Sequence, residues 1–415
     1  MASSRAAVAI ARAQSAFRPV AGDPALALFI AALGLRPAVI GIGPIATAMA
    51  TDLRVSHAYV ALLETIPIIC MGLFAPIGPF LAARLGDRAT MALGLSVVVV
   101  AGALRAVAPS ATAIVLLTVA VGIATGAAGA LPAFVGKLRA GFGRTGIAAA
   151  ASATGIVTGA TFAAAAAGPV AAFLGGWRPT VAVMGLVCLI PLAGWLALVG
   201  PAPSRTPPSA RTRGHVWLRP VAWLLALAYG LQGIAYWGAN AWLPGAFVEQ
   251  GWSATSAGTL VALLNGGTLV GNLFLVLFSR RVGRRPLLVT SAAAIGAGTV
   301  ALTVQPHFAI AWTLLMGLGN GMIYPLLLAL TMDVAEDEAA AGAIGAFMLL
   351  VGYELSALGP VVIGLVRDAE GSFRLPLVLL AAAGVSVIVP SLALARGTRL
   401  AVSSVGPTVD IGQTS

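Results

Sequence analysis

Charged residues are scarce inside the long apolar stretches of this sequence, and these few residues are the ones whose types could do chemistry. Arg36 stands in "GLRPAVIGIGP" (34–44), Glu64 lies in the next apolar stretch, and Glu354 lies in "LLVGYELSALGP" (349–360). In lipid a charged side chain costs at least about 2.5–3.5 kcal/mol at mid-depth, so it normally faces a wet cavity or the interior of a helix bundle. A guanidinium there can hold a small anion through forked hydrogen bonds, and a carboxyl group can carry a proton.

Each of these residues also has a structural interpretation. Arg36 contacts a substrate or forms a structural ion pair. Glu64 is the counterion of Arg36, a proton carrier, or a carboxylate without a role near the outer opening. Glu354 is a coupling residue, or a neutral acid that is hydrogen-bonded to a neighbouring helix through Tyr353 or Asn320. The sequence leaves these alternatives open.

A polar and aromatic stripe recurs at every fourth position of another apolar stretch, at Gln232, Tyr236 and Asn240. Residues four apart share one face of a helix, so these side chains predict a pocket wall at mid-depth, with hydrogen bonding between helices as the structural alternative. Trp237 and a second tryptophan flank the stripe. Secondary candidates on other stretches are Asn265, Asn320 and Tyr324.

The composition shows which kind of chain must position these residues. Of the 415 residues, 59% are hydrophobic and 9% are charged, whereas a soluble domain carries about 25% charged residues. The formal net charge is +11, but the arginines gather in short connections between apolar stretches, which indicates membrane orientation and not nucleic-acid binding. The two cysteines lie inside apolar stretches and predict neither a disulfide nor a metal site.

Apolar stretches of about 20 residues, the length of a membrane-crossing helix, recur along the chain and predict an all-α polytopic membrane protein. We expect twelve spans, at 24–50, 57–82, 89–108, 111–136, 145–170, 178–199, 219–246, 255–279, 286–305, 308–332, 340–366 and 374–395. Eighteen basic residues fall on one side of these spans and four on the other, namely Arg54, Arg178, Arg367 and Arg374. This bias predicts a multi-pass protein of the cytoplasmic (inner) membrane with both termini in the cytoplasm.

The longest connection, "GPAPSRTPPSARTRGHVWLRP" (200–220), is rich in proline, serine and arginine. Such a stretch cannot form a core and predicts a flexible cytoplasmic linker. We therefore divide the chain into a cytoplasmic tail (1–23), a first six-helix bundle (24–199), the linker (200–218), a second six-helix bundle (219–395) and a second cytoplasmic tail (396–415).

Three further features concern packing and the membrane faces. Glycine pairs in "GIATGAAGA" (122–130) and "TGIVTGATF" (154–162) place small residues four apart, which favours close helix packing. Arg105, near a turn, is expected to reach the outer interface with its charged end. An acidic inner loop either closes the cytoplasmic side by ion pairs or is solvated; its residues are Asp333, Glu336, Asp337 and Glu338.

The two halves of the chain repeat each other. The connection "ARLGDR" (83–88) corresponds to "RRVGRR" (280–285), because Gly86 and Gly283 are 197 residues apart. The same spacing relates Arg84 to Arg281 and Arg88 to Arg285. "GLRP" at 34 likewise precedes "GLQG" at 230 by 196 residues, which makes Gln232 the approximate counterpart of Arg36. Two six-helix halves in parallel repeat are the arrangement of major facilitator transporters.

With these motifs the sequence resembles the major facilitator superfamily along almost its whole length. "SRRVGRRP" is similar to the D-R-x-G-R-R-P loop of that family, and "ARLGDR" to a degenerate copy of it. The loop residues that match are Arg84, Gly86, Arg88, Arg281, Gly283 and Arg285. Ala83 and Arg280 stand where aspartate is usual, which removes the acidic partner of the helix-locking ion pair attributed to this motif.

A more specific resemblance is to the cyanate transporter branch, which also contains nitroimidazole exporters. It rests on "LRPAVIGIGP", "ALLETIP" with "MGL", "GALRAVAP", "AWLPGAF" and "GLGNGMIYPLLLAL". The resemblance implies a major facilitator fold, with 12 transmembrane helices in two six-helix halves that rock about a central site. It implies a secondary active transporter of a small anion such as cyanate. The alternative is a proton-coupled exporter of a small drug-like compound such as a nitroimidazole, with Glu64 or Glu354 as the proton carrier.

Other classes of protein are not favoured. No phosphate-cradling loop with its lysine is found, so an ATP-driven pump is unsupported. An enzyme would need a catalytic cluster at one depth, whereas the two deep acids lie in opposite halves. We therefore expect a non-enzyme without cofactor or metal, whose partners are a small-molecule substrate, possible coupling protons and the lipid bilayer. Nucleic acid is not an expected partner, and the chain is expected to be a monomer.

Overall fold

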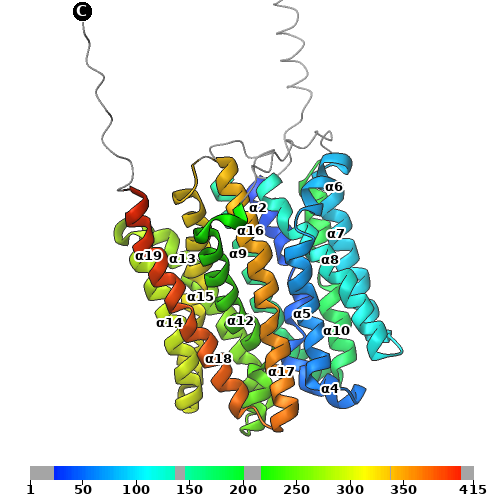
Figure 1. Cartoon of the computed structure of the whole chain (residues 1–415). Helices are drawn as coiled ribbons and strands as arrows, with labels where there is room; N and C mark the ends of the chain where they lie inside the picture. Colours follow the sequence, from blue (N-terminus) through cyan, green and yellow to red (C-terminus); the bar gives the residue numbers. More distant parts are fainter. Residues whose placement is uncertain (1–22, 136–144, 201–215, 337, 403–415) are drawn as a thin grey trace, which may run out of the picture.

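The computed structural model describes residues 23–135, 145–200, 216–336 and 338–402, and these residues form helices without any strand. Eleven helical segments of this part of the chain are long and apolar enough to cross a membrane. The pair His57–Leu73 and Ile77–Leu85, bent by 65°, adds a twelfth span if it is counted as one. The prediction of an all-helical, multi-pass membrane protein is confirmed (Figure 1).

The first half of the chain holds the spans up to residue 198. Its helices are α2 (Pro24–Leu33), α3 (Pro37–Ile40), η1 (Gly43–Ile45), α4 (Ala46–Leu53), α5 (His57–Leu73), α6 (Ile77–Leu85), α7 (Asp87–Leu104), η2 (Arg105–Val107), α8 (Ala111–Val135), α9 (Thr145–Leu174), α10 (Trp177–Leu186) and α11 (Leu189–Leu198). The segments from α2 to α4 form the first span, and α10 with α11 form the sixth.

The second half follows the predicted linker. Its helices are η5 (Val216–Leu218), α12 (Pro220–Glu249), α13 (Ala254–Val282), α14 (Arg284–Val304), η6 (Pro306–Phe308), α15 (Ala309–Asp333), α16 (Glu338–Ser356), α17 (Leu358–Glu370), α18 (Arg374–Ser386) and α19 (Ile388–Val402). α19 continues beyond the predicted end of the last span at 395, because a helix need not stop where the membrane does. Most of the predicted linker and tails, together with Asp337, lies outside the described residues.

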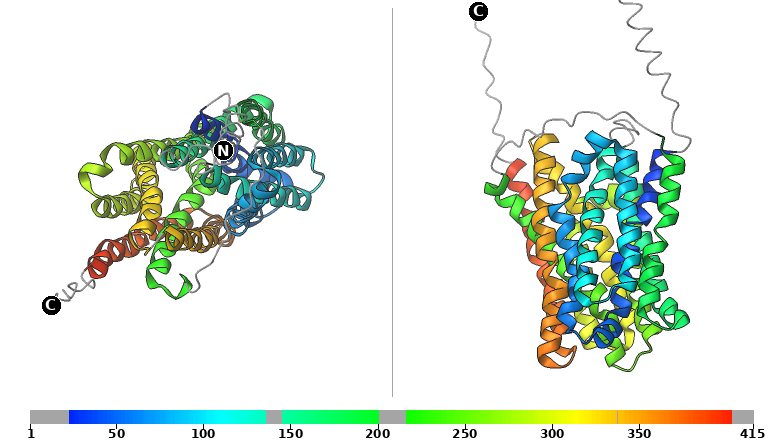
Figure 2. Two further views of the ribbon diagram at one scale, coloured as in Figure 1. Left: turned by 90° about the horizontal axis from the view of Figure 1, so that it is seen from above. Right: turned by 90° about the vertical axis from the view of Figure 1, so that its right-hand side faces the viewer.

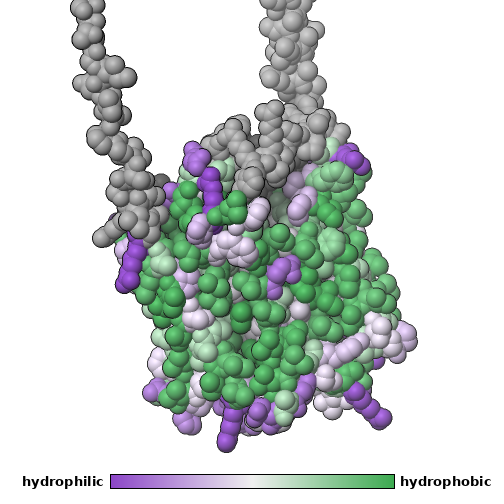
Figure 3. All heavy atoms as spheres, viewed as in Figure 1, coloured by the Kyte–Doolittle hydropathy of each residue, from purple (hydrophilic) through white to green (hydrophobic). Residues whose placement is uncertain are grey.

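The helices of the two halves form two groups side by side, as Figure 2 shows in the view from above. α9 packs against α13, and α5 packs against α16 and α17, so these helices make the main contacts between the halves. Hydrophobic side chains cover the middle of the face seen in Figure 3, and polar residues gather toward both ends of the bundle. This distribution suits a bilayer with water on either side.

We call the end of the bundle where α2 begins and α19 ends the terminal side, and the opposite end the remote side (Figure 1). The halves touch closely on the remote side. Gly364 of α17 lies against the backbone of His57 and Ala58 at the start of α5. At mid-depth the Thr65 hydroxyl donates a hydrogen bond of 3.4 Å to the carbonyl of Ala357. The remote side is therefore closed in this conformation.

Helix α9 packs closely on α2 through the predicted glycine pair. A side chain at Gly155 would collide with the carbonyl oxygen of Phe29, and one at Gly159 with that of Leu33. Gly122 and Gly126 of α8 lie in the same way against Cys70 of α5. The expectation of close packing at both glycine pairs is confirmed, and the structure identifies the helices that occupy each pair.

The two repeated connections have nearly identical backbones. Gly86 has φ 84° and ψ 155°, and Gly283 has φ 82° and ψ 156°. This region of φ and ψ is open essentially to glycine alone. The correspondence seen in "ARLGDR" and "RRVGRR" is thus present in the backbone as well as in the letters.

Replacing Gly283 by alanine is expected to lower the free energy of unfolding by about 1–3 kcal/mol through backbone strain. No steric collision contributes, because the nearest atom to an added Cβ is Pro286 Cδ at 3.9 Å. Thermal unfolding in detergent measures the effect. Gly342→Ala is the matched control, since a Cβ there meets nothing within 4 Å and the residue has no positive φ. Equal unfolding temperatures for the two variants would contradict the strain argument.

Candidate functional site

Arg36 occupies a break in the first span. α2 ends at Leu33 and α3 begins at Pro37, which has no N–H to continue the helix, so Arg36 lies in the turn between them. Its Nη1 donates to Met71 Sδ of α5 at 3.0 Å, and its guanidinium lies over the Trp237 ring of α12, 5.1 Å from the centroid. Met71 belongs to the first half and Trp237 to the second. The guanidinium therefore lies at the interface between the halves.

Arg36 has no acidic partner among the described residues. In particular, no ion pair joins it to Glu64, so the counterion interpretation of Glu64 is not seen in this conformation. A guanidinium has five N–H donors, and a thioether sulfur is a weak acceptor for one of them. The side chain is only half-buried. Most of its donors are thus available to a ligand.

Aromatic rings of the second half lie near this cation. Tyr229 packs against Tyr324 and Tyr353, with ring centroids 5.5 and 5.3 Å away. Tyr236 packs edge-to-face on Trp237 at 5.3 Å. Arg36 lies close enough to interact electrostatically with the hydroxyl groups of three of these residues, Tyr229, Tyr236 and Tyr324. The site is a positive charge within a largely aromatic wall supplied by the second half.

The predicted polar stripe on α12 forms a hydrogen-bond chain with α13. The Tyr236 hydroxyl donates to Asn265 Oδ1 at 2.6 Å, and Asn265 Nδ2 donates to Asn240 Oδ1 at 2.8 Å. Asn240 Nδ2 in turn donates to the Tyr236 carbonyl at 2.8 Å. Asn240 and Asn265 are fully buried, so these two amides hold the helices together and present Tyr236 to the site.

The other predicted pocket residues, on α12 and α15, differ in their hydrogen bonding. Gln232, one turn before Tyr236, is buried but makes no hydrogen bond with another described residue. Asn320 Nδ2 donates to the Met316 carbonyl within α15, while its buried Oδ1 has no donor. Tyr324, one turn further along α15, reaches the site through its contact with Tyr229.

Glu64 lies on α5, between the Arg36 site and the remote side. It is 2% exposed, and neither carboxylate oxygen has a hydrogen-bond partner. Its Oε1 lies 3.2 Å from the position that a Cβ on Gly43 would take. The carboxyl group therefore faces η1 at the contact with the second half.

Glu354 of α16 faces the first half. Its Oε1 is buried without a partner and lies 3.0 Å from the position of a Cβ on Gly72 of α5. The hydrogen bond to Tyr353 or Asn320 considered from the sequence is not present between these described residues. Glu64 of the first half and Glu354 of the second half thus have similar positions, because each carboxyl group lies where the two halves meet.

The repeated loops are bonded within their own halves. The Arg84 guanidinium lies over the Phe80 ring at 4.3 Å, and Arg88 Nη2 donates to the Leu196 carbonyl at 3.0 Å. In the second loop, Arg281 and Arg285 make no ion pair with another described residue. Their neighbour Arg284, which the motif comparison passed over, pairs with Asp333 of α15.

The acidic loop does not join the halves through its described residues. Asp333 pairs with Arg284, and Glu336 pairs with Arg219 at 2.9 Å. All four residues belong to the second half. The pairs fasten helices of that half to one another on the terminal side.

The structure contradicts the expectation that Arg105 reaches the outer interface. Arg105 is fully buried, and its Nη2 donates to the Ala38 carbonyl at 2.6 Å. Weaker contacts lead to the Gly102 carbonyl at 3.4 Å and Thr118 Oγ1 at 3.5 Å. The reason is the break in the first span, whose short helix α3 offers a carbonyl that a long side chain can reach. Arg105 thus supports the segment that directly follows Arg36.

An ionic and aromatic cluster on the remote side joins the halves, and sequence reasoning missed it. The Asp368 carboxylate of α17 accepts hydrogen bonds from the backbone N–H groups of His57 and Ala58, at 3.1 and 2.9 Å. His57 Nδ1 lies 2.8 Å from the same carboxylate. The His57 ring also packs against Trp242 and Phe373. The partners are 311 residues apart, so no local pattern in the sequence could reveal them.

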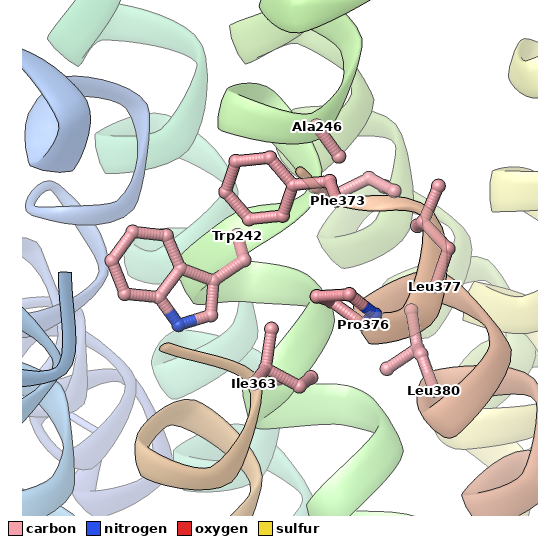
Figure 4. A pocket seen from close by; sticks show the side chains of 9 residues that line it. Trp242, Ala246, Ile363, Phe373, Pro376, Leu377 and Leu380 are labelled. Carbon is pink, nitrogen blue, oxygen red and sulfur yellow. The ribbon is translucent and has the colours of Figure 1, made fainter. Parts of the chain in front are cut away.

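A small recess elsewhere in the second half is apolar and separate from the Arg36 site. It lies between α12, α17 and α18, with lining residues such as Ile363, Leu377 and Leu380 (Figure 4). Its one polar side-chain atom, Trp242 Nε1, already donates to the Pro360 carbonyl at 2.8 Å. The recess has no group to orient a polar ligand. Among the described residues, no cluster of histidine, cysteine and carboxylate side chains could hold a metal ion.

One family model and two curated transporters match this chain over most of its length. The sequence model described as "Major Facilitator Superfamily" matches residues 25–360 and 226–403. The cyanate transport protein CynX of Escherichia coli (strain K12) is 27% identical over 349 residues, covering 84% of this chain and 91% of that protein. The 2-nitroimidazole transporter of the same organism is 29% identical over 358 residues, with 84% and 89% covered.

Solved structures share the fold at low sequence identity. The nucleoside transporter NupG superposes with a TM-score of 0.71 at 12% identity, covering 90% of this chain and 100% of that one. A D-xylose-proton symporter superposes with the same TM-score at 15% identity, covering 91% and 98%. These similarities concern the arrangement of the helices.

Proposed function

Because the chain belongs to the major facilitator superfamily, we propose that it moves a small anion, with cyanate as the specific candidate, by alternating access. The family membership makes it a multi-pass membrane transporter and not an enzyme. Family membership leaves the substrate, the direction of transport and the coupling open, and the residues of the site bear on the substrate. We place the protein in the cytoplasmic membrane as a monomer with both termini in the cytoplasm, the orientation that the arginine bias favours.

The observation that carries the proposal is the half-buried guanidinium of Arg36 without an acidic partner among the described residues. A charge held partly inside the membrane without an ionic partner or a ligand is costly, so its presence there calls for a compensating interaction. A bound anion supplies that compensation. The planar guanidinium can hold a linear or planar anion through two parallel hydrogen bonds.

The surrounding groups favour a compact ligand. Trp237 covers one face of the guanidinium, and the hydroxyl of Tyr236 is fixed by the amide chain through Asn265. Such a wall leaves a few directed donors in an otherwise apolar setting, which is typical of small-molecule sites. One relative is named as a cyanate transport protein, which agrees with a small anion.

Alternating access follows from the position of the site. Arg36 lies between Met71 of the first half and Trp237 of the second, and the halves meet on the remote side. Rocking of the halves would close the terminal side and open the remote side about this site. The anion must then bind the two conformations with different free energies to shift their equilibrium.

Arg36→Gln is expected to abolish binding of cyanate, measured as ligand-induced thermal stabilisation of the purified protein. Each charge-assisted hydrogen bond lost costs about 1.5–3 kcal/mol, or roughly 10- to 150-fold in Kd. Uptake of cyanate into proteoliposomes is expected to fall in parallel. Arg374→Gln removes an exposed arginine away from the site and serves as the matched control. Unchanged stabilisation by cyanate in Arg36→Gln would overturn the anion site.

The second candidate is proton-coupled export of a compact drug-like compound such as a nitroimidazole. The aromatic wall of Tyr229, Tyr324 and Tyr353 favours a flat ring, and a relative is named as a 2-nitroimidazole transporter. The same stabilisation assay, run with small anions and with nitroheterocycles at two pH values, separates the candidates. Stabilisation by nitroheterocycles alone would favour the second.

A further inference from the structure

Three oxygen acceptors lie around Gly43, at the contact between the halves. Two are the carboxylate oxygens of Glu64, which is 2% exposed. The third is the carbonyl oxygen of Asn240 in α12, which lies so close to Gly43 that a side chain there would collide with it. Glu64 Oε1 lies 3.2 Å from the same Cβ position, so the carboxyl and the carbonyl are neighbours.

The Asn240 carbonyl lacks its helical donor because of Pro244. In an α-helix the carbonyl of residue i accepts from the N–H of residue i+4, and proline has none. α12 continues through Pro244 as a helix, so the carbonyl keeps its direction along the helix while losing its partner. Gly43, without a side chain, lets η1 and Glu64 approach this acceptor.

We propose that a proton on Glu64 fastens the two halves on the remote side by a hydrogen bond from its carboxyl group to the Asn240 carbonyl. The inference rests on the proposed alternating access, and it names an ion that controls closure of the remote side and the place where that ion acts. The proton comes from water when the remote side is open. It returns to water after that contact separates.

The physical reason is the balance of donors and acceptors. A neutral carboxyl has one O–H donor, which can satisfy the Asn240 carbonyl. An ionised carboxylate has none, so closure would bury a charge and two acceptors against a third acceptor. Closure of the remote side and protonation of Glu64 are therefore linked, and each favours the other.

The other ionisable groups on the elements packed against α5 are placed differently. On α12, the Tyr236 hydroxyl is within electrostatic reach of Glu64 but donates to Asn265. On α4, Asp52 accepts from Trp177 Nε1. On α16, Tyr353 and Glu354 face Gly72, two helical turns from Glu64 along α5.

Most of the other ionisable groups near α5 lie at the remote end of the bundle. On α17, Asp368 holds His57 at the start of α5, and the neighbouring Arg367 lies 3.5 Å from Glu249. Glu370 follows at the end of α17. On α5 itself, Tyr59 lies in the first turn, and Cys70 packs against Gly122 and Gly126 of α8. α8 and η1 contain no charged residue by sequence. Arg36, directly before α3, donates to Met71 Sδ of α5, about two helical turns from Glu64. His57 is therefore the residue to replace in a control variant.

The test is a distance measurement between the halves as a function of pH. Spin labels are attached at Thr51→Cys and Ala369→Cys, two exposed remote-side positions in opposite halves, in a Cys70→Ala, Cys188→Ala background. Between about pH 5 and about pH 9, the short-distance population is expected to decrease, with the closed-to-open ratio falling about 5- to 150-fold. In Glu64→Gln, whose amide can always donate to Asn240, the short distance is expected at both pH values.

Two further variants make the outcome decisive. His57→Gln is expected to keep the change of distance with pH. The proposal would be overturned if His57→Gln lost this pH response while Glu64→Gln kept it. Pro244→Ala gives the Asn240 carbonyl a helical N–H donor and is expected to weaken closure at low pH. If the distance in Pro244→Ala changed with pH as it does in the wild type, the proposed hydrogen bond to the Asn240 carbonyl would be overturned.

The experiment also tests the proton separately from other ions and from the substrate. If sodium chloride, but not choline chloride, closed the remote side at high pH, a sodium ion and not a proton would be the ion that controls closure, and the proposal would be overturned. The distance measurement needs no substrate, so a failure of cyanate to bind leaves it informative. Conversely, a distance that does not change with pH would overturn the role of Glu64 without affecting the proposed anion site at Arg36.

Discussion

An alanine in place of Gly43 is expected to prevent closure of the remote side and to abolish transport. The added Cβ would collide with the Asn240 carbonyl, a backbone atom inside α12 that cannot rotate away. Overpacking of this kind typically costs about 1–3 kcal/mol. Because the collision lies between the halves, the halves can relieve it by separating. The variant should therefore fold and stay in the conformation that is open on the remote side.

The distance between labels at Thr51→Cys and Ala369→Cys measures this result, together with substrate uptake into proteoliposomes. Gly258→Ala is the matched control, since it also lies between the halves but its Cβ would meet Pro44 Cβ at an ordinary 3.6 Å. We expect the control to transport normally. Wild-type uptake by Gly43→Ala would show that the tight contact at Asn240 is not needed in the transport cycle.

Gly159→Ala is expected to destabilise the folded protein instead of shifting its conformation. The Cβ would collide with the carbonyl oxygen of Leu33, the last residue of α2 before the break that carries Arg36. Both helices belong to the first half and pack along their length, so neither can move away without loosening that half. We expect a loss of about 1–3 kcal/mol of stability, which lowers the unfolding temperature by roughly 2–12 °C.

Gly168→Ala on the same helix is the control. It has the same gain in helix propensity, about 1 kcal/mol, but its Cβ would meet Thr255 Cα at 3.7 Å without collision. Thermal unfolding and yield after purification compare the two variants. If Gly159→Ala were as stable as Gly168→Ala, α2 and α9 could not be packed as described.

Helical content and the position of the spans were predictable because they depend on local composition. The break at Arg36 was predictable in the same way, since Pro37 removes a backbone donor. The stripe of Tyr236 and Asn240 was recognised by its spacing, and the structure adds Asn265 as the residue that links them. Local signals thus located the spans and most of the polar residues that meet at the interface.

Long-range pairs were not predictable, because nothing in the sequence says which distant residues become neighbours. The contact of His57 with Asp368 and the burial of Arg105 against Ala38 are of this kind. Tyr229 was missed although it precedes Tyr236 by seven residues, a spacing that places both on one helix face. The mistake about Arg105 came from reading its nearness to a turn without knowing that a broken helix lay beside it.

The contact at Asp368 has a consequence for the speed of the cycle. Three bonds, from His57 N, His57 Nδ1 and Ala58 N, end on one carboxylate and must be broken together when the remote side opens. If each contributes about 1 kcal/mol net, the barrier rises by roughly 3 kcal/mol and the opening rate falls by a factor on the order of 100. The lifetime of the closed conformation, and with it the maximal turnover, would then be set at the remote end. Affinity would be determined separately, by the guanidinium and its aromatic wall near the middle of the bundle.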